Sequence, residues 1–265
     1  EEDFEIFGYP TFTVEFTADK PNAFLYAELC DIHPDGAATR VSYGLMNLTH
    51  LDGHEKVTYL EPGKKYKATV TLDVCGHVFP KGHRVRLAVA NSFWPMIWPS
   101  PEKVTLKLDL STAEFTLPIF TGKDTEGPNM EAKCAPLTPM TVLKEGVVNR
   151  EITYDLLTDS WTSITDGVGG VFGEGIYRFD DIGTVVEHNL KRILTVSNSD
   201  PSDARYEIIQ KMKNGRPGWE IDCDIDVVQT ADKENFYLTG FMDASINGEH
   251  AFHRDYDVTV PRNGL

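Results

Sequence analysis

The chain has 265 residues, 41% hydrophobic and 25% charged, so it is long enough for one large domain or two ordinary ones. Its formal net charge of −16 argues against nucleic acid or an anionic membrane surface as a partner. No segment approaches the roughly 18 apolar residues that a membrane-spanning helix needs, and the acidic N-terminus lacks the features of a signal peptide. We therefore expect a globular protein located in the cytoplasm.

About seven segments of the first 120 residues alternate between apolar and polar side chains, as strands with one buried face do. The clearest of them are 11–17, 23–30, 39–48, 67–74, 103–109 and 113–119. Residues 72–95 predict two buried strands joined by a bend at Pro80-Lys81-Gly82, and Gly44 is a candidate bulge. No segment has a convincing helical period, so the pattern favours a sandwich or jelly roll.

Periodicity is lost over 121–141, which we interpret as a linker or long connection. The remaining residues, 142–265, predict a second β-rich unit with strands at 147–157, 184–187, 191–198 and 204–213. A strictly alternating strand follows at 219–228, and Asn247-Gly248 predicts a hairpin between 236–246 and 249–260. The sequence also begins almost on a strand, which we take as the sign of a piece cut from a longer chain.

Residues that could bind a metal are present, but their spacing favours other roles. The three acidic side chains of one strand face, Asp222, Asp224 and Asp226, fit a solvated surface better than a calcium loop. His250 and His253, three apart on a strand, should point to opposite faces. The four cysteines (Cys30, Cys75, Cys134 and Cys223) are far apart, and we interpret them as reduced thiols without excluding a disulfide. We expect no metal and no cofactor.

Three motifs of the first 120 residues resemble one known family. Phe79-Pro80-Lys81-Gly82-His83-Arg84-Val85-Arg86-Leu87, followed by Asn91-Ser92-Phe93-Trp94-Pro95, resembles the C-terminal jelly-roll domain of the CocE/NonD hydrolases. That family includes X-Pro dipeptidyl-peptidase, cocaine esterase and α-amino-acid ester hydrolase. The turn Leu29-Cys30-Asp31-Ile32-His33-Pro34-Asp35-Gly36 and the segment 59–66 match in the same order. The resemblance covers residues 5–120 and is weaker over 148–262.

The resemblance implies an all-β, galactose-binding-like jelly roll over 1–120. It also implies a parent serine hydrolase whose catalytic residues lie in a preceding α/β-hydrolase domain. No serine of this chain lies in the Gly-x-Ser-x-Gly pattern of a nucleophile elbow, so we assign no catalytic residue. The expected function is a non-catalytic C-terminal region that packs on the hydrolase domain of the same parent chain and shapes its active site. Homo-oligomerisation is left open.

Two groups of residues are candidates for specific roles. The loop of Phe93, Trp94, Met96 and Trp98 is the one concentrated aromatic segment, and it could be a domain contact, a substrate wall, a carbohydrate platform or part of the sandwich core. The matched turns supply structural candidates: Asp31, Asp35, Gly36, His83 and Arg84. Two roles are considered for His83. We favour a structural role, in which His83 hydrogen-bonds loop carbonyls and fixes the bend. The alternative is a functional site that His83 shares with Asp31 or Asp73.

The alternative function, of another class, is a free-standing ligand-binding β-sandwich for carbohydrate. Fold analogy permits that function but does not demonstrate it.

Overall fold

The structure, a computed structural model, describes residues 2–122, 135–170 and 173–265. The chain divides into two compact units, which are described separately. Unit 1 contains the described residues up to 122 together with Asn263–Leu265, and unit 2 contains those from 135 to Arg262. The described residues form strands and two short 3-10 turns, so the all-β class is confirmed. No helix among them is long and apolar enough to cross a membrane.

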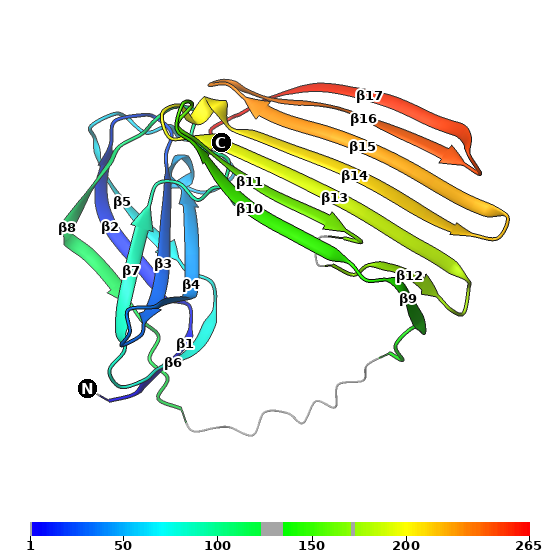
Figure 1. The fold of residues 1–265 in the computed structure, drawn as a ribbon. Helices are drawn as coiled ribbons and strands as arrows, with labels where there is room; N and C mark the ends of the chain where they lie inside the picture. The colour runs from blue at the N-terminus through cyan, green and yellow to red at the C-terminus, as the bar shows by residue number, and fades with distance from the viewer. Residues whose placement is uncertain (1, 123–134, 171–172) are drawn as a thin grey trace. The chain divides into compact units, whose positions relative to one another are not determined.

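Unit 1 contains eight strands in three antiparallel sheets (Figure 1). One sheet has the order β5-β2-β8, a second has the order β4-β3-β7, and β1 pairs with β6. Their bounds are β1 Phe4–Gly8, β2 Thr11–Ala18, β3 Phe24–Ile32, β4 Ala38–Asn47, β5 Lys65–Thr71, β6 Cys75–Phe79, β7 Arg84–Ala90 and β8 Leu106–Thr116.

A hydrophobic core joins the sheets of unit 1. Alternation on β2 buries Phe12, Val14 and Phe16, while alternation on β3 buries Leu25, Ala27 and Leu29. Side chains of both three-stranded sheets belong to one contiguous cluster, as in two packed sheets of a sandwich. The predicted sandwich is therefore present, whereas the jelly-roll and galactose-binding-like labels stay predictions.

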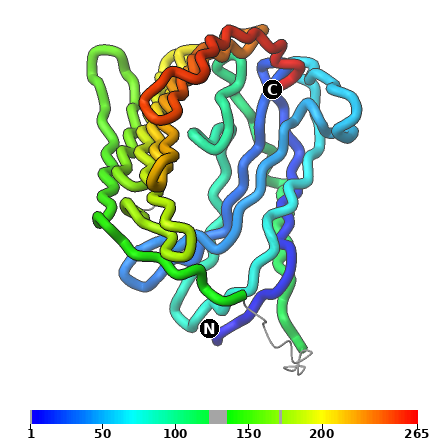
Figure 2. Tube along the Cα trace, turned by 90° about the vertical axis from the view of Figure 1, so that its right-hand side faces the viewer, coloured from blue at the N-terminus to red at the C-terminus, as the bar shows by residue number. Residues whose placement is uncertain are grey.

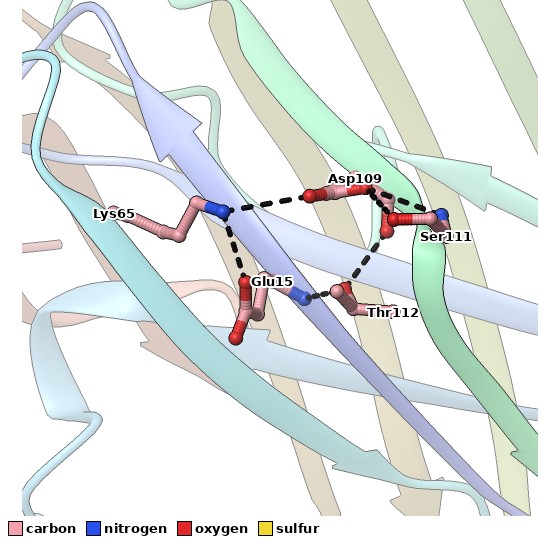
Figure 3. Close-up of polar contacts among 5 residues, drawn as sticks. All are labelled: Glu15, Lys65, Asp109, Ser111 and Thr112. Carbon is pink, nitrogen blue, oxygen red and sulfur yellow. Dashed lines mark hydrogen bonds and ion pairs between the residues drawn. The ribbon is translucent and has the colours of Figure 1, made fainter.

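The predicted strands 103–109 and 113–119 are one strand, β8, with an irregularity in its pairing to β2 (Figure 3). At the irregularity, Thr112 Oγ1 accepts a hydrogen bond from the backbone N–H of Glu15 at 3.1 Å. The Asp109 carboxylate accepts bonds from Ser111 N–H and Oγ, and the Lys65 ammonium contacts both Glu15 and Asp109. The Thr112 hydroxyl thus takes the place of a backbone acceptor for the Glu15 N–H where the register shifts.

The interpretation of 72–95 as two buried strands is partly wrong. Strands β6 and β7 flank the bend, but β6 pairs with β1 and β7 pairs with β3, so they do not form a hairpin. Because β7 is an edge of its sheet, Val85 and Val89 remain 38% and 37% exposed. The bulge expected at Gly44 instead lies where β4 passes Leu29 and Cys30. Gly44 pairs regularly with Ala27, and it is a glycine because the backbone of Thr71 approaches it closely.

Unit 2 is one nine-stranded antiparallel sheet with the order β10-β11-β13-β14-β15-β16-β17, and β12 pairs with both β13 and β9. Figure 2 views its strands nearly end-on, as a curved row of successive passes. The bounds are β9 Met140–Lys144, β10 Val147–Asp155, β11 Ser160–Val168, β12 Ile176–Phe179, β13 Thr184–Ser197, β14 Arg205–Arg216, β15 Trp219–Ala231, β16 Asn235–Ile246 and β17 Glu249–Pro261.

Most of the predicted strands of unit 2 are confirmed. The segment 204–213, ambiguous by pattern, is β14, and Asn247-Gly248 forms the predicted hairpin with positive φ at both residues. The two segments 184–187 and 191–198 are a single strand, β13. Most of the predicted linker, from 123 to 134, lies outside the described residues.

Candidate functional site

Strand alternation places Asp31 at a buried position near the end of β3. Residues 25, 27 and 29 of this strand are core side chains, and Asp31 is the next residue on the same face, only 3% exposed. A carboxylate in such a position requires hydrogen-bond donors, because removing it from water unpaired is costly.

Two histidines supply those donors. His83, at the bend before β7, places Nδ1 2.8 Å from Asp31 Oδ1, and His77 of β6 places Nε2 3.0 Å from Oδ2. Burial alone would raise the pKa of Asp31, but the two histidine hydrogen bonds outweigh it and hold that pKa below its usual value. The Asp31 carboxylate therefore joins β3, β6 and the bend before β7.

The same end of unit 1 carries the other candidates from the matched turn. Asp35 Oδ1 accepts a hydrogen bond from the Ala37 N–H, and Gly36 has a φ of +92°, which favours glycine. The ring of His33 lies 4.6 Å from that of His83, and its Nε2 contacts Thr39 Oγ1. Arg84 is exposed at the start of β7.

For His83, the alternative that joined it to Asp31 matches the observed contact. The expected bond to a loop carbonyl is made by the backbone, from the His83 N–H to the Pro80 carbonyl at 3.0 Å, and not by the imidazole at Nδ1. Asp73, the other acid considered, lies elsewhere: its N–H donates to the Tyr43 carbonyl, and its carbonyl accepts from Ser42 Oγ.

The aromatic loop is anchored to unit 1 at its first residue. The Phe93 ring stacks on Tyr26 of β3, with centroids 4.1 Å apart and planes at 19°, and it also contacts Tyr43 of β4. Farther along, Trp94 and Trp98 meet edge to face at 5.4 Å, while Met96 is 67% exposed. The structure therefore brings the candidate residues into one loop, with Phe93 holding it and Met96 presented to solvent.

A polar cluster on β3 lies next to this aromatic anchor. The Tyr26 hydroxyl and the Cys30 thiol both donate to the Glu28 carboxylate. Burial would raise the pKa of Glu28, but these bonds and the charges of Arg40 and Arg86 lower it. Burial and the bond to Glu28 raise the pKa of Cys30, so its thiolate is disfavoured and it is a poor nucleophile.

The remaining sequence candidates are the acidic residues of β15 and the cysteines. Asp222 and Asp224 of β15 face Lys213 and Lys211 of β14, at 3.7 and 4.0 Å, as a solvated acidic face would. Asp226 departs from this prediction, because the residue is half-buried and its Oδ1 atom is buried. Cys30, Cys75 and Cys223 are free thiols, and Cys134 lies outside the described residues.

The expectation that His250 and His253 point to opposite faces is wrong. A register shift between β16 and β17 at Ala244 and Ser245 inserts one extra residue, so both imidazoles reach the carboxylate of Asp243. The distances to Asp243 Oδ1 are 3.9 Å from His250 and 2.7 Å from His253.

Sequence reasoning missed His77, His33 and the pair Tyr26 and Glu28. For His77 a signal existed: Asp31 continues the buried alternation of β3, which implies a donor nearby. The partner itself comes from β6, forty-six residues away in sequence, and no local pattern identifies it.

The fold and these contacts define an all-β domain with a structural polar centre and a half-buried aromatic loop that presents Met96 to solvent. Residues 1–133 match the family model of the X-Pro dipeptidyl-peptidase C-terminal non-catalytic domain, and the chain therefore belongs to this family. The predicted resemblance to the C-terminal domain of the CocE/NonD hydrolases is confirmed.

Two curated relatives share part of the chain. A putative Xaa-Pro dipeptidyl-peptidase of Streptomyces avermitilis is 37% identical over 84 residues, which are 32% of this chain and 12% of the relative. The cocaine esterase of Rhodococcus sp. strain MB1 Bresler is 29% identical over 69 residues, which are 26% of this chain and again 12% of the relative. The chain thus spans about an eighth of the length of these relatives.

Among solved structures, an α-amino acid ester hydrolase aligns with a TM-score of 0.43 and 18% identity. The alignment covers 45% of this chain and 24% of that protein.

Proposed function

We propose that unit 1 packs against an α/β-hydrolase domain of the same parent polypeptide and helps to form the wall of its active site. The family is by definition a non-catalytic C-terminal part of a larger hydrolase, which implies a catalytic domain as its partner. The relatives are named a putative Xaa-Pro dipeptidyl-peptidase and a cocaine esterase, and we propose that the parent is a serine hydrolase of the dipeptidyl-peptidase or acyl-ester hydrolase class.

The observation that carries the proposal is the construction of the aromatic loop. Phe93 is fixed by stacking on Tyr26, which makes the loop costly to displace, while Met96 is left 67% exposed beside Trp94 and Trp98. Aromatic and methionine side chains on a firmly held loop are typical anchors of protein interfaces. The loop would therefore insert Met96 into the partner domain, with the half-buried Trp94 and Trp98 beside it.

We also propose the division predicted from the sequence, with domains at 1–120 and 142–265 and a connection at 121–141, except that the last three residues, Asn263–Leu265, belong to the first domain. Limited proteolysis should then cut between 121 and 141 before it cuts elsewhere. Early cleavage inside either range would contradict the division.

The loop proposal is tested in the full-length parent protein. The double variant Trp94→Ala and Trp98→Ala, and the single variant Met96→Asp, should lower activity or the stability of the catalytic domain at least several-fold. Ser92→Ala, an exposed neighbour of the loop, is the matched control. Unchanged activity and stability in both loop variants would overturn the proposal.

A separate experiment tests the proposal that the 265-residue chain has no catalytic nucleophile and no hydrolase activity of its own. With a fluorophosphonate probe and a p-nitrophenyl ester, we expect no mass shift and no release of nitrophenol. A stoichiometric label would reveal a nucleophile within this chain.

The carbohydrate alternative receives less support from the loop. Sugars stack on flat aromatic faces, whereas Trp94 and Trp98 meet at an interplanar angle of 77°. The carbohydrate-binding function would be supported if calorimetric titration showed binding of a common sugar and if this binding were lost in the Trp94→Ala variant.

A further inference from the structure

Three side chains with metal-ligand chemistry converge at the end of β3. Asp31 comes from the strand itself, His33 from the turn that follows, and His83 from the bend before β7. In the described part of the chain, they form the one group of at least three His, Cys, Asp or Glu residues whose ligand atoms lie within 4.8 Å of one another.

We propose that Asp31, His33 and His83 bind a divalent transition-metal ion of the zinc class. One carboxylate oxygen and two imidazole nitrogens are a ligand set that suits zinc and its neighbours cobalt and nickel. The two histidines are half-buried, so a fourth ligand position is open to water, while Asp31 lies in the interior.

The distances require only a small contraction. Bonds of about 2.0–2.2 Å to a common ion bring ligand atoms to roughly 3–3.5 Å from one another. Asp31 Oδ1 and His83 Nδ1 are already 2.8 Å apart, and the two imidazole rings are 4.6 Å apart by centroid. Rotation of the His33 side chain, which belongs to a surface turn, would bring its nitrogen within range.

His77 would orient the carboxylate ligand. Its Nε2 holds Asp31 Oδ2 at 3.0 Å, so Oδ1 is directed toward His83 and the proposed ion. Carboxylate ligands of metal sites are commonly fixed by such a hydrogen bond from a neighbouring side chain, and its removal weakens metal binding.

Hydrogen bonding to Asp31 accounts for His77 and His83 but not for His33. The hydrogen bond of His33 goes to the exposed Thr39 hydroxyl, at 3.0 Å. The position of the His33 ring beside His83 is therefore not needed for hydrogen bonding to the buried Asp31 carboxylate. Metal binding would account for that position.

The bound ion would tie β3 and its following turn to the bend before β7. An ion that binds the folded state and not the unfolded state raises the unfolding midpoint, and the stabilisation grows with the logarithm of the ion concentration once that concentration exceeds the Kd. The inference is independent of the loop proposal, because it concerns unit 1 alone and needs no catalytic domain.

The test uses the tag-free 265-residue chain, titrated with Co²⁺ and followed by visible absorption, and with Zn²⁺ followed by calorimetry. We expect one ion per chain. Bound Co²⁺ should show the visible absorption bands of a low-symmetry site, and these bands should disappear when Zn²⁺ displaces the Co²⁺. His33→Gln should weaken binding at least 10-fold, and His77→Gln should weaken it about 10- to 100-fold.

His33→Gln is the deciding variant, because it leaves the bonds of Asp31 to His77 and His83 in place and should fold normally by circular dichroism. The matched controls are His54→Gln, from the exposed pair His50 and His54, and His253→Gln, from the cluster on β17. Both should keep the wild-type affinity within twofold. No stoichiometric Co²⁺ binding, full affinity in His33→Gln, or loss of affinity in either control would overturn the proposal.

Discussion

The side-chain amide of Asn47 donates a hydrogen bond of 2.8 Å to the backbone carbonyl of Gly264, more than two hundred residues later in the sequence. The same carbonyl accepts a bond from the hydroxyl of Thr49, which is fully buried. Asn47 Oδ1 in turn accepts a bond from the Thr49 N–H and lies 2.9 Å from the Thr49 hydroxyl, whose single proton is shared between this oxygen and the Gly264 carbonyl. These contacts incorporate Asn263–Leu265 into unit 1.

Asn47→Ala should destabilise unit 1 by about 1–3 kcal/mol, because it leaves buried partners of the amide without their hydrogen bonds. Chemical denaturation followed by tryptophan fluorescence measures the change. Ser92→Ala, at an exposed position of the same unit, should shift stability by less than about 0.5 kcal/mol. Equal effects of the two substitutions would show that the Gly264 contact contributes nothing.

Gly44→Ala should destabilise unit 1 by about 1–3 kcal/mol, because it forces atoms into occupied space. The new Cβ would lie 2.5 Å from the Thr71 carbonyl oxygen, which is backbone and cannot rotate away. Gly76→Ala is the matched control, since its Cβ would meet the exposed Phe7 ring at 3.2 Å, and that ring can move. The midpoint temperature of thermal unfolding should be well below that of Gly76→Ala in the Gly44→Ala variant. The reverse order of the two midpoints would refute the steric argument.

Tyr26→Phe should cost about 0.5–1.5 kcal/mol at neutral pH, because the Glu28 carboxylate loses a hydrogen-bond donor. The folded-state pKa of Glu28 lies below its usual 4.5, so its stabilising contribution is present above that pH and is lost as the pH falls through the folded pKa. The difference between Tyr26→Phe and wild type should therefore shrink on acidification. Denaturation curves between pH 7 and pH 3 measure it, and a constant difference would contradict the assignment.

The imidazole of His253 should titrate above pH 6.5, because hydrogen bonds to the Asp243 and Asp255 carboxylates raise its pKa. For a raised pKa, the stabilisation is complete below pH 6.5 and disappears as the pH rises through the folded value. Histidine NMR titration should show a lower pKa in Asp243→Asn and a smaller decrease in Asp255→Asn. An unchanged pKa in Asp243→Asn would contradict the contact.

The alternation of apolar and polar residues is sufficient to predict most strands, because a strand with one buried face requires a period-2 pattern. Alternation is not sufficient where strand pairing determines the extent or the burial of a strand. Residues 103–119 look like two strands, yet polar groups around Asp109 and Thr112 carry a single strand through its irregularity. Likewise, β7 has the composition of a buried strand but is an edge, and edge position depends on partners distant in sequence.

The candidate residues were predicted less completely than the strands. The aromatic loop and Asp31 were found because local composition and motif resemblance mark them. The register shift beside Ser245, which turns His250 and His253 to the same side, has no sequence signal comparable to Asn247-Gly248. His77 was missed because the contact that gives it a role joins two sheets.

The strand order has a consequence for how the chain folds. From β13 to β17, each strand pairs with the next one in sequence, so the sheet of unit 2 can grow by short hairpin closures. Unit 1 must instead pair strands that are far apart in sequence, Phe4 with Phe79 and Thr11 with Thr116. Its hydrogen bond to Gly264 can form only after the rest of the chain has been made. Because non-local pairing slows folding, the later half of the sequence should reach its native state first. During synthesis the earlier half would remain incomplete until Gly264 has left the ribosome.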